Sequence, residues 1–431
     1  MGRVRNFCRD THGILLAATV VALTLGAPLS HGQTLNVLHN FAGGADGLYP
    51  VAGLTIDSTG DNLYGTTAGL IYTNGSSYGT VFRLKNHNGS WVFTPLYRFT
   101  GGNDGAYPLA RVVIGPNGTL YGTANRGGGS TNICFQGCGV VFNVHVGPTF
   151  PPTPLTPWIE QVLYAFQGST DGAYPGYGDL VFDASGNIYN TGSQGGINNC
   201  PGHVGCGVVY KMTLSGGHYT ESSLYGFTGG ADGAFPIAGV GFDHSGDIYT
   251  TAYNGGNNNN GTVIELTPSG NNFTESTIHQ FSAGSDGANP WTGVIVDSSG
   301  NLYGTTSLDG PDGGGTVYEM MSSGQGFTFG VMQSFSGSGP NPGPLADLAM
   351  DASGNLYGTT YAGGTHGAGN VFKLTRSGNG FTYSDLYDFT GGTDGSNPAS
   401  NVVIDASGNL YGTTYQGGSD NYGVVWELEL N

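Results

Sequence analysis

The chain has 431 residues, of which 81 are glycine, 12% are aromatic and only 9% are charged. Its formal net charge at pH 7 is −18, which repels nucleic acids and anionic membranes and excludes a nucleic-acid-binding protein. Abundant glycine with few charges is typical of an all-β domain with many turns.

The N-terminus carries the pattern of a secretory signal. Three arginines before residue 10 precede an apolar run from Ile14 to Leu25, and a small-residue segment at 30–32 offers a cleavage site before Gln33. We therefore predict a signal peptide over 1–32. The alternative is an uncleaved anchor, for which the apolar run is short. After cleavage we expect a secreted or periplasmic chain, 33–431, with no membrane insertion. It carries 8 Lys and Arg against 28 Asp and Glu, a formal charge of −20.

Residues 33–431 contain a sevenfold repeat, most copies of which spell F-x-G-x-x-D-G-x-x-P. Successive copies start 58, 67, 61, 54, 54 and 54 residues apart, a period typical of propellers and solenoids. The phenylalanine and proline recur in every copy, as Phe41/Pro50, Phe99/Pro108, Phe166/Pro175, Phe227/Pro236, Phe281/Pro290, Phe335/Pro344 and Phe389/Pro398.

Each period contains four short runs rich in Val, Ile, Thr, Tyr and Phe, separated by turn residues. Four strands per period make one propeller blade, whereas solenoid rungs are only about 20 to 30 residues long. The last period supplies three strands, at Asn401–Asp405, Asn409–Thr414 and Gly423–Leu430, and the chain begins with a lone fourth strand, Leu35–Phe41. Pairing the first strand with the last removes the open sheet edges. We predict a closed, monomeric, all-β seven-bladed β-propeller.

Four cysteines remain after the signal, and all lie between the second and third strands of adjacent blades. The simplest interpretation is two local disulfides, Cys134 to Cys138 and Cys200 to Cys206, in an oxidising compartment. The alternative is one shared four-thiolate metal site, although these spacings are not those of common zinc sites.

Six aspartates of the G-x-x-D-G loops occupy equivalent positions: Asp46, Asp104, Asp171, Asp232, Asp286 and Asp394. The meander topology places these loops on one face, where we expect the six carboxylates to ring the central channel. A structural role, accepting amide hydrogen bonds from the same loop, is one interpretation. The other is a ligand-binding ring, with calcium as a possible ion. The sixth copy has Pro340 instead and leaves a gap in the ring.

A second set of aspartates begins the motif D-x-x-G-(N/D), which is typical of tight hairpins, so we interpret it as turn chemistry. Blade two has Gly115 and Pro116 there instead, a change that a turn tolerates and a catalytic acid does not. The six members are Asp57, Asp183, Asp243, Asp297, Asp351 and Asp405.

The blocks D-x-x-G-N-L-Y-G-T-T, G-G-x-x-x-x-G-x-V-F and F-x-G-G-x-D-G-x-x-P together resemble the GloVer (Gloeo-Verruco) repeat family of exported bacterial proteins. The likeness covers residues 34–431. It implies a secreted or surface propeller with no established activity. The D-x-x-G-N-x-Y turn also resembles NHL-type propellers, which mainly bind partners.

We carry two hypotheses of function. The first is a non-catalytic extracellular module that binds a glycan or a protein at the loop face. The second is a polysaccharide hydrolase or lyase in which two carboxylates from different blades converge over the channel. In either case we expect the functional residues to lie where the repeat is broken. Such positions include Pro340, the cysteine loops, Trp291 at the start of an inner strand and the proline-rich insertion 147–158.

Overall fold

A computed structural model describes residues 33–430 except 71–76, 116–117, 130, 149–155, 197–199, 271, 325, 338–341 and 379. The residues from Gln33 to Leu430 form one compact unit. The predicted signal peptide, 1–32, lies outside the described residues, as does Pro340. In the part of the chain that the structure describes, no helix has the length and apolar character needed to cross a membrane.

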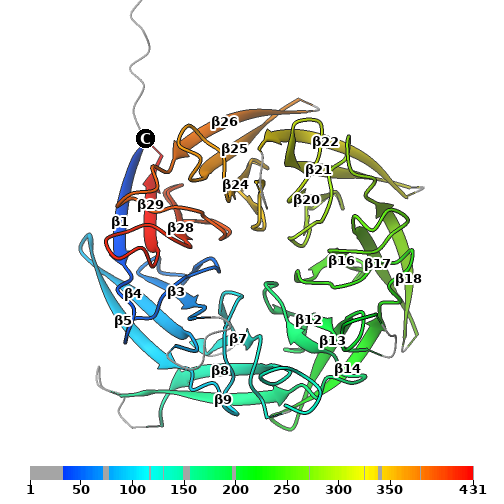
Figure 1. Cartoon of the computed structure of the whole chain (residues 1–431), viewed down its shortest axis with the longest axis horizontal. Coiled ribbons are helices and arrows are strands. Elements are labelled where there is room, and N and C mark those ends of the chain that lie inside the picture. The colour runs from blue at the N-terminus through cyan, green and yellow to red at the C-terminus, as the bar shows by residue number, and fades with distance from the viewer. Residues whose placement is uncertain are drawn as a thin grey trace, which may run out of the picture. The chain divides into compact units, whose positions relative to one another are not determined.

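Seven antiparallel sheets are arranged in a ring, which confirms the predicted seven-bladed propeller (Figure 1). The innermost strands are short: β2 (Thr55–Ile56), β6 (Val113–Ile114), β11 (Val181–Phe182), β15 (Gly241–Phe242), β19 (Ile295–Val296), β23 (Ala349–Met350) and β27 (Val403–Ile404). The second strands are β3 (Asn62–Thr67), β7 (Leu120–Ala124), β12 (Ile188–Gln194), β16 (Ile248–Ala252), β20 (Leu302–Thr306), β24 (Leu356–Thr360) and β28 (Leu410–Thr414).

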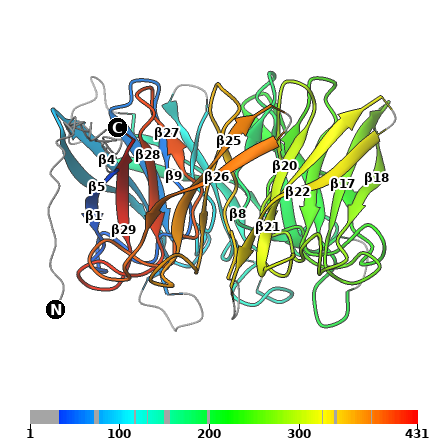
Figure 2. The same cartoon turned by 90° about the horizontal axis from the view of Figure 1, so that it is seen from above.

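The third strands are β4 (Thr80–His87), β8 (Val140–Val146), β13 (Val208–Ser215), β17 (Thr262–Ser269), β21 (Gly313–Ser323), β25 (Asn370–Ser377) and β29 (Val424–Glu429). The outermost are β5 (Ser90–Arg98), β9 (Trp158–Ala165), β14 (His218–Gly226), β18 (Asn272–Gln280), β22 (Gly326–Ser336), β26 (Gly380–Asp388) and β1 (Thr34–Asn40). The strands run between the two faces of the ring (Figure 2). One face carries the G-x-x-D-G and cysteine loops, and we call it the loop face.

The ring closes as predicted, because β1 pairs with β29 and completes the seventh sheet in the order β1-β29-β28-β27. The antiparallel register places Thr34 opposite Glu429 and Asn40 opposite Val424, with one irregularity between Val37 and His39. This pairing leaves blade seven with the same four strands as its neighbours.

The core lies between blades, where the repeated aromatic residues pack. The motif phenylalanines are buried, and each contacts the aromatic residue of a third strand where one is present, as Phe389 does with Trp426 at a ring-centroid distance of 5.8 Å. The glycine of L-Y-G-T-T makes room for that ring: a Cβ on Gly412 would lie 2.3 Å from the Trp426 ring. The strands therefore carry apolar residues on both faces, because each blade is covered by two others.

The residue before the motif proline holds adjacent blades together. Tyr49 has φ +59° and Phe235 has φ +58°, a backbone region that is costly for aromatic residues unless the surroundings fix it. At Phe235 the N–H donates to the carbonyl of Cys206 in the preceding blade at 2.8 Å, and the carbonyl accepts from Tyr253 N at 3.1 Å. The same pair of bonds recurs at Tyr49, so the strained residue is fixed from both sides.

Blade three departs from the four-strand pattern. An added strand, β10 (Ala173–Pro175), pairs with β12 beside the short inner strand β11. Between Pro175 and the inner strand this blade also has one residue more than the others. Tyr177, which follows the insertion, lines the cavities at the centre of the ring.

Candidate functional site

The six loop aspartates turn their carboxylates back into their own loops. Each accepts a hydrogen bond from the backbone N–H four residues earlier, with N–O distances of 2.7 to 3.2 Å; the donors are Ala42, Thr100, Gln167, Thr228, Ser282 and Thr390. Each also contacts the side chain seven residues earlier, on the outer strand: His39, Tyr97, Tyr164, Tyr225, His279 and Tyr387. These contacts give every carboxylate a local structural role.

The sixth copy has both members of this contact changed. The outer-strand position that bears tyrosine or histidine elsewhere is Gln333, on β22 of blade five, seven residues before Pro340. The carboxylate acceptor and its usual partner are therefore replaced together, although Pro340 itself lies outside the described residues. The gap in the aspartate series is explained by the loss of a structural contact.

The channel mouth is formed by other side chains. The cavities at the centre of the ring are lined mainly by residues that follow the motif proline, together with Tyr361 and Tyr415 after the second strands, and none of the six aspartates lines them. Among the described residues, no group of three or more His, Cys, Asp or Glu side chains is arranged to hold a metal ion. Ligand binding and calcium binding by the six loop aspartates stay predictions.

We expect Asp286→Asn to cost about 1 to 3 kcal/mol of folding stability, because the amide cannot accept from all of the Ser282 and His279 donors at once. Urea denaturation at pH 7 measures the loss. The exposed loop residue Asp420 provides the control, since Asp420→Asn removes the same charge without a carboxylate cap. Equal stability of the two variants would contradict the structural role.

The second aspartate set has the turn role that its motif predicts. Asp297 accepts hydrogen bonds from Ser299 N, Asn301 N and the Asn301 side chain at 2.8 to 2.9 Å. Burial raises the pKa of Asp297, but these hydrogen bonds and one from Tyr303 together outweigh burial. The pKa therefore lies below its ordinary value. In blade two, Gly115 keeps the turn through a backbone bond to the Thr119 carbonyl at 2.8 Å.

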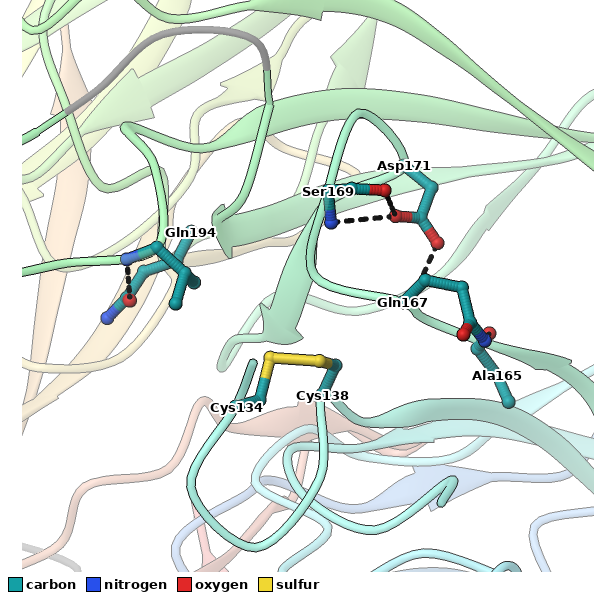
Figure 3. Close-up of a disulfide and its surroundings, with 8 residues drawn as sticks. Cys134, Cys138, Ala165, Gln167, Ser169, Asp171 and Gln194 are labelled. Carbon is teal, nitrogen blue, oxygen red and sulfur yellow. Dashed lines mark hydrogen bonds between the residues drawn. A yellow bond between two sulfur atoms is a disulfide. The ribbon is translucent and has the colours of Figure 1, made fainter. Parts of the chain in front are cut away.

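Both cysteine pairs form the predicted local disulfides, Cys134–Cys138 and Cys200–Cys206. Each lies against the first glycine of the next blade's F-x-G motif: a Cβ on Gly168 would be 2.7 Å from both sulfurs of the first disulfide. Figure 3 shows this disulfide next to the loop in which Asp171 accepts from Gln167 and Ser169. The disulfides therefore fill the junction between blades on the loop face.

Sevenfold symmetry breaks at one position near the ring axis. The second residue before each inner strand is glycine in three blades and polar or charged in the other four: Gly53, Arg111, Asp179, Gly239, Gly293, Asp347 and Asn401. A narrow space of about 30 Å³ has lining residues from all seven blades, including Arg111, Asp179, Asp347 and Asn401, so it lies on the axis. We call these four residues the axial cluster. The space holds about one water molecule.

An ion pair spans the axial cluster. Arg111 Nε donates to Asp179 Oδ2 at 2.5 Å, and the side chains keep 28% and 16% of their surface exposed. A second guanidinium nitrogen of Arg111 donates to the Leu54 carbonyl at 3.3 Å. Burial lowers the pKa of Arg111, but the Asp179 carboxylate outweighs this and leaves the pKa raised. Arg111 therefore remains a cation.

Asp347 is the second carboxylate of the axial cluster. Its Oδ1 accepts from Gly293 N at 2.9 Å. Burial, followed by the charge of Asp179, raises the pKa of Asp347 to about 6, although Arg111 opposes the rise. Burial likewise raises the pKa of Asp179, opposed by Arg111 and by a hydrogen bond from Asn401. The cluster therefore gains or loses a proton just below neutral pH.

An aromatic bowl opens above the axial cluster on the loop face. Its volume is about 220 Å³, and its wall consists of Val51, Tyr177, Trp291, Leu345, Tyr361, Ala399 and Tyr415. Trp291 lies at ring-centroid distances of 5.3 Å from both Tyr177 and Tyr253, which fixes its orientation. Five of the wall residues also line the axial space, so the bowl leads down to the axial cluster.

A third cavity, of about 190 Å³, lies on the other side of the axial cluster and is lined by the start of the inner strands. Arg111, Asp179, Asp347 and Asn401 border both this cavity and the axial space. Sequence reasoning singled out Trp291 but missed the axial cluster. The signal was available in the alignment of the repeats, as the one column in which glycine alternates with charged and amide residues.

The fold and this axial arrangement define a seven-bladed β-propeller with a symmetry-breaking polar cluster at its centre. The chain belongs to the Gloeobacter/Verrucomicrobia repeat family, whose pattern matches residues 19–204 and 199–426. This confirms the family resemblance seen in the sequence motifs. Among proteins with curated descriptions, none matches the chain.

Two solved structures illustrate the likeness of fold. A Bacteroides uniformis protein assigned provisionally as a 6-phosphogluconolactonase has 16% identity and a TM-score of 0.52, over 84% of this chain and 88% of its own. The extracellular domain of a provisionally assigned one-component system from B. thetaiotaomicron has 13% identity and a TM-score of 0.53. That match covers 90% of this chain but only 40% of the other. At such identities the likeness extends to the propeller fold alone.

Proposed function

We propose that the protein is an exported, non-catalytic binding module that holds the end of a glycan in the aromatic bowl on the loop face. The observation that carries the proposal is that four aromatic side chains, Tyr177, Trp291, Tyr361 and Tyr415, line one cavity above a polar floor. Export is supported by the signal pattern at 1–32 and by the two disulfides.

The wall of the bowl has the chemistry for a sugar ring. Aromatic faces offer apolar, rigid contact area to the C–H face of a pyranose at low entropic cost. The four aromatic residues are only partly buried, so their surfaces remain available. A volume of about 220 Å³ is below the roughly 300 to 1,000 Å³ of drug-sized sites. The bowl therefore accommodates one terminal unit of a longer chain.

The floor of the bowl supplies the polar contacts that orient a ligand. Asn401 provides an amide, and Asp179 and Asp347 provide carboxylate acceptors for hydroxyl groups. Few but well-placed polar groups beneath an apolar wall are the usual arrangement of a small-ligand site. In this proposal the axial cluster determines which ligand is bound, and the aromatic wall supplies most of the binding free energy.

A second candidate is the polysaccharide hydrolase or lyase, which the pairing of Asp179 with Asp347 favours. Two carboxylates in different environments are the requirement for glycosidic acid–base chemistry. However, on the side of the bowl the space beside them is about 30 Å³, which admits a water and not a sugar linkage. Binding therefore ranks above catalysis.

We expect Trp291→Ala to weaken glycan binding at least about tenfold, because the variant loses the largest aromatic face of the bowl. A panel of immobilised oligosaccharides, followed by calorimetry on any that retain the protein, measures the effect with and without a calcium chelator. Trp91, on the outer strand β5, is the matched control. The proposal fails if no glycan is retained, or if both tryptophan variants bind alike.

A further inference from the structure

We infer that the ligand of the axial site carries an ammonium group, as the chain end of an amino sugar does, and that this group lies at the carboxylate of Asp347. This inference rests on the proposed glycan binding and specifies its ligand class. Three observations carry it: the charge of the axial cluster, the free acceptor on Asp347 and the aromatic wall.

The axial cluster has one carboxylate more than it has cations. Of the described residues that line the three axial cavities, only Arg111, Asp179 and Asp347 are acidic or basic. The guanidinium of Arg111 donates to Asp179 at 2.5 Å and to the backbone carbonyl of Leu54 at 3.3 Å. Asp347 therefore contributes a negative charge that has no dedicated counter-ion when it is ionised.

The free acceptor is on the same residue. Asp347 receives one hydrogen bond, from Gly293 N to Oδ1 at 2.9 Å, and it lines both the axial space and the cavity beyond it. A carboxylate accepts at both oxygens when ionised, so Oδ2 has capacity for a donor that arrives through the bowl. A primary ammonium carries three donors and a full positive charge.

The wall of the bowl adds to this preference. Tryptophan and tyrosine faces attract cations through the ring quadrupole, most strongly where water is excluded. Trp291 and Tyr177 line both the bowl and the axial space. A ligand that stacks on these rings thus places its polar end beside the axial cluster, between aromatic faces and a carboxylate.

Protonation of Asp347 controls the charge that the ligand meets. The charged groups facing it are Arg111 and Asp179, and Tyr318 of β21 also lies close enough to interact with it. Burial and the charge of Asp179 raise the pKa of Asp347 to about 6. Above this pH the cluster is negative and attracts an ammonium group, and below it the attraction is lost.

The test compares three β-1,4-linked dimers that differ only at carbon 2: cellobiose with a hydroxyl, N,N′-diacetylchitobiose with an acetamide, and the glucosamine dimer with an amine. Calorimetric titrations at pH 7 use the full protein, Asp347→Asn and Asp420→Asn. Asp420 is exposed on the same face and controls for net charge. A change in intrinsic tryptophan fluorescence that is absent in Trp291→Ala reports ring stacking on Trp291 independently of the other three tryptophans.

We expect the glucosamine dimer to bind the unaltered protein roughly tenfold more tightly than cellobiose. Asp347→Asn should abolish that preference, Asp420→Asn should retain it, and lowering the pH below about 6 should remove it from the unaltered protein. Equal binding of all three dimers overturns the inference and leaves glycan binding intact. Absence of binding by every dimer and every panel glycan overturns both.

Discussion

Replacement of Arg111 by methionine should destabilise the fold by about 3 kcal/mol at pH 7. Removing one partner of a buried ion pair costs roughly 3 to 5 kcal/mol, and the lower value applies because the Arg111 side chain keeps 28% of its surface exposed to the channel. The variant leaves the carboxylates of Asp179 and Asp347 together without a cation. Chemical denaturation as a function of pH measures the loss.

The pH dependence identifies the cause of this loss. Without Arg111 the pKa of each carboxyl group must rise further, so the folded state takes up protons that the unfolded state has released. The deficit is then largest above pH 7 and shrinks as the pH falls toward 5. Arg98→Met, at an exposed position at the end of β5, should change stability by less than about 0.5 kcal/mol. A deficit that does not vary with pH would refute the electrostatic explanation.

Asp347→Asn should instead stabilise the protein, by about 2 to 3 kcal/mol at pH 7. The ordinary pKa of 3.8 rises to about 6 in the folded state, and each tenfold change in proton affinity corresponds to about 1.4 kcal/mol. Between these two values the folded state holds a proton that the unfolded state has lost, so stability falls as the pH rises. Asparagine lacks this penalty, and its side-chain oxygen can still accept from Gly293 N.

The gain should disappear as the pH falls below the ordinary pKa of 3.8, where Asp347 becomes protonated in both states. Asp351→Asn, only four residues away, provides a control of opposite sign. Hydrogen bonds from Asn355 and Ser353 outweigh burial and lower the pKa of Asp351, so its carboxylate stabilises the fold above its ordinary pKa and this stabilisation is lost in acid. If Asp347→Asn proves as destabilising as Asp351→Asn, the carboxylate has a structural role and not a binding role.

The ring architecture could be predicted because the repeat imposes the same requirement on every blade. The proline recurs because the chain enters every inner strand with the same backbone conformation. The phenylalanine recurs because every junction between blades is filled by the same aromatic side chain. The extra strand at Ala173–Pro175 was not predicted. It depends on a single inserted residue near Gly176, whose effect on pairing with β12 is a matter of tertiary geometry.

The candidate site was harder to predict for a related reason. The six loop aspartates were predicted as a candidate site because they recur. Recurrence, however, reflects a structural requirement that the blades share. Here that requirement is a carboxylate that accepts hydrogen bonds within its own loop, as Asp232 does. A site on the axis must be asymmetric, because seven copies of arginine or aspartate cannot share one point. Arg111, Asp179 and Asp347 therefore appear in the sequence as isolated exceptions, and only the fold brings them together.

The pairing of β1 with β29 also determines how the ring responds to force. Thr34, where β1 begins, is opposite Glu429, where β29 ends. The first and last residues of the unit therefore leave the sheet at the same end of these two strands. Tension applied between these two residues acts first on the pair at Thr34. The six residue pairs then separate one after another toward Asn40. The pairing that closes the ring at rest thus opens one residue pair at a time when the two ends are pulled apart.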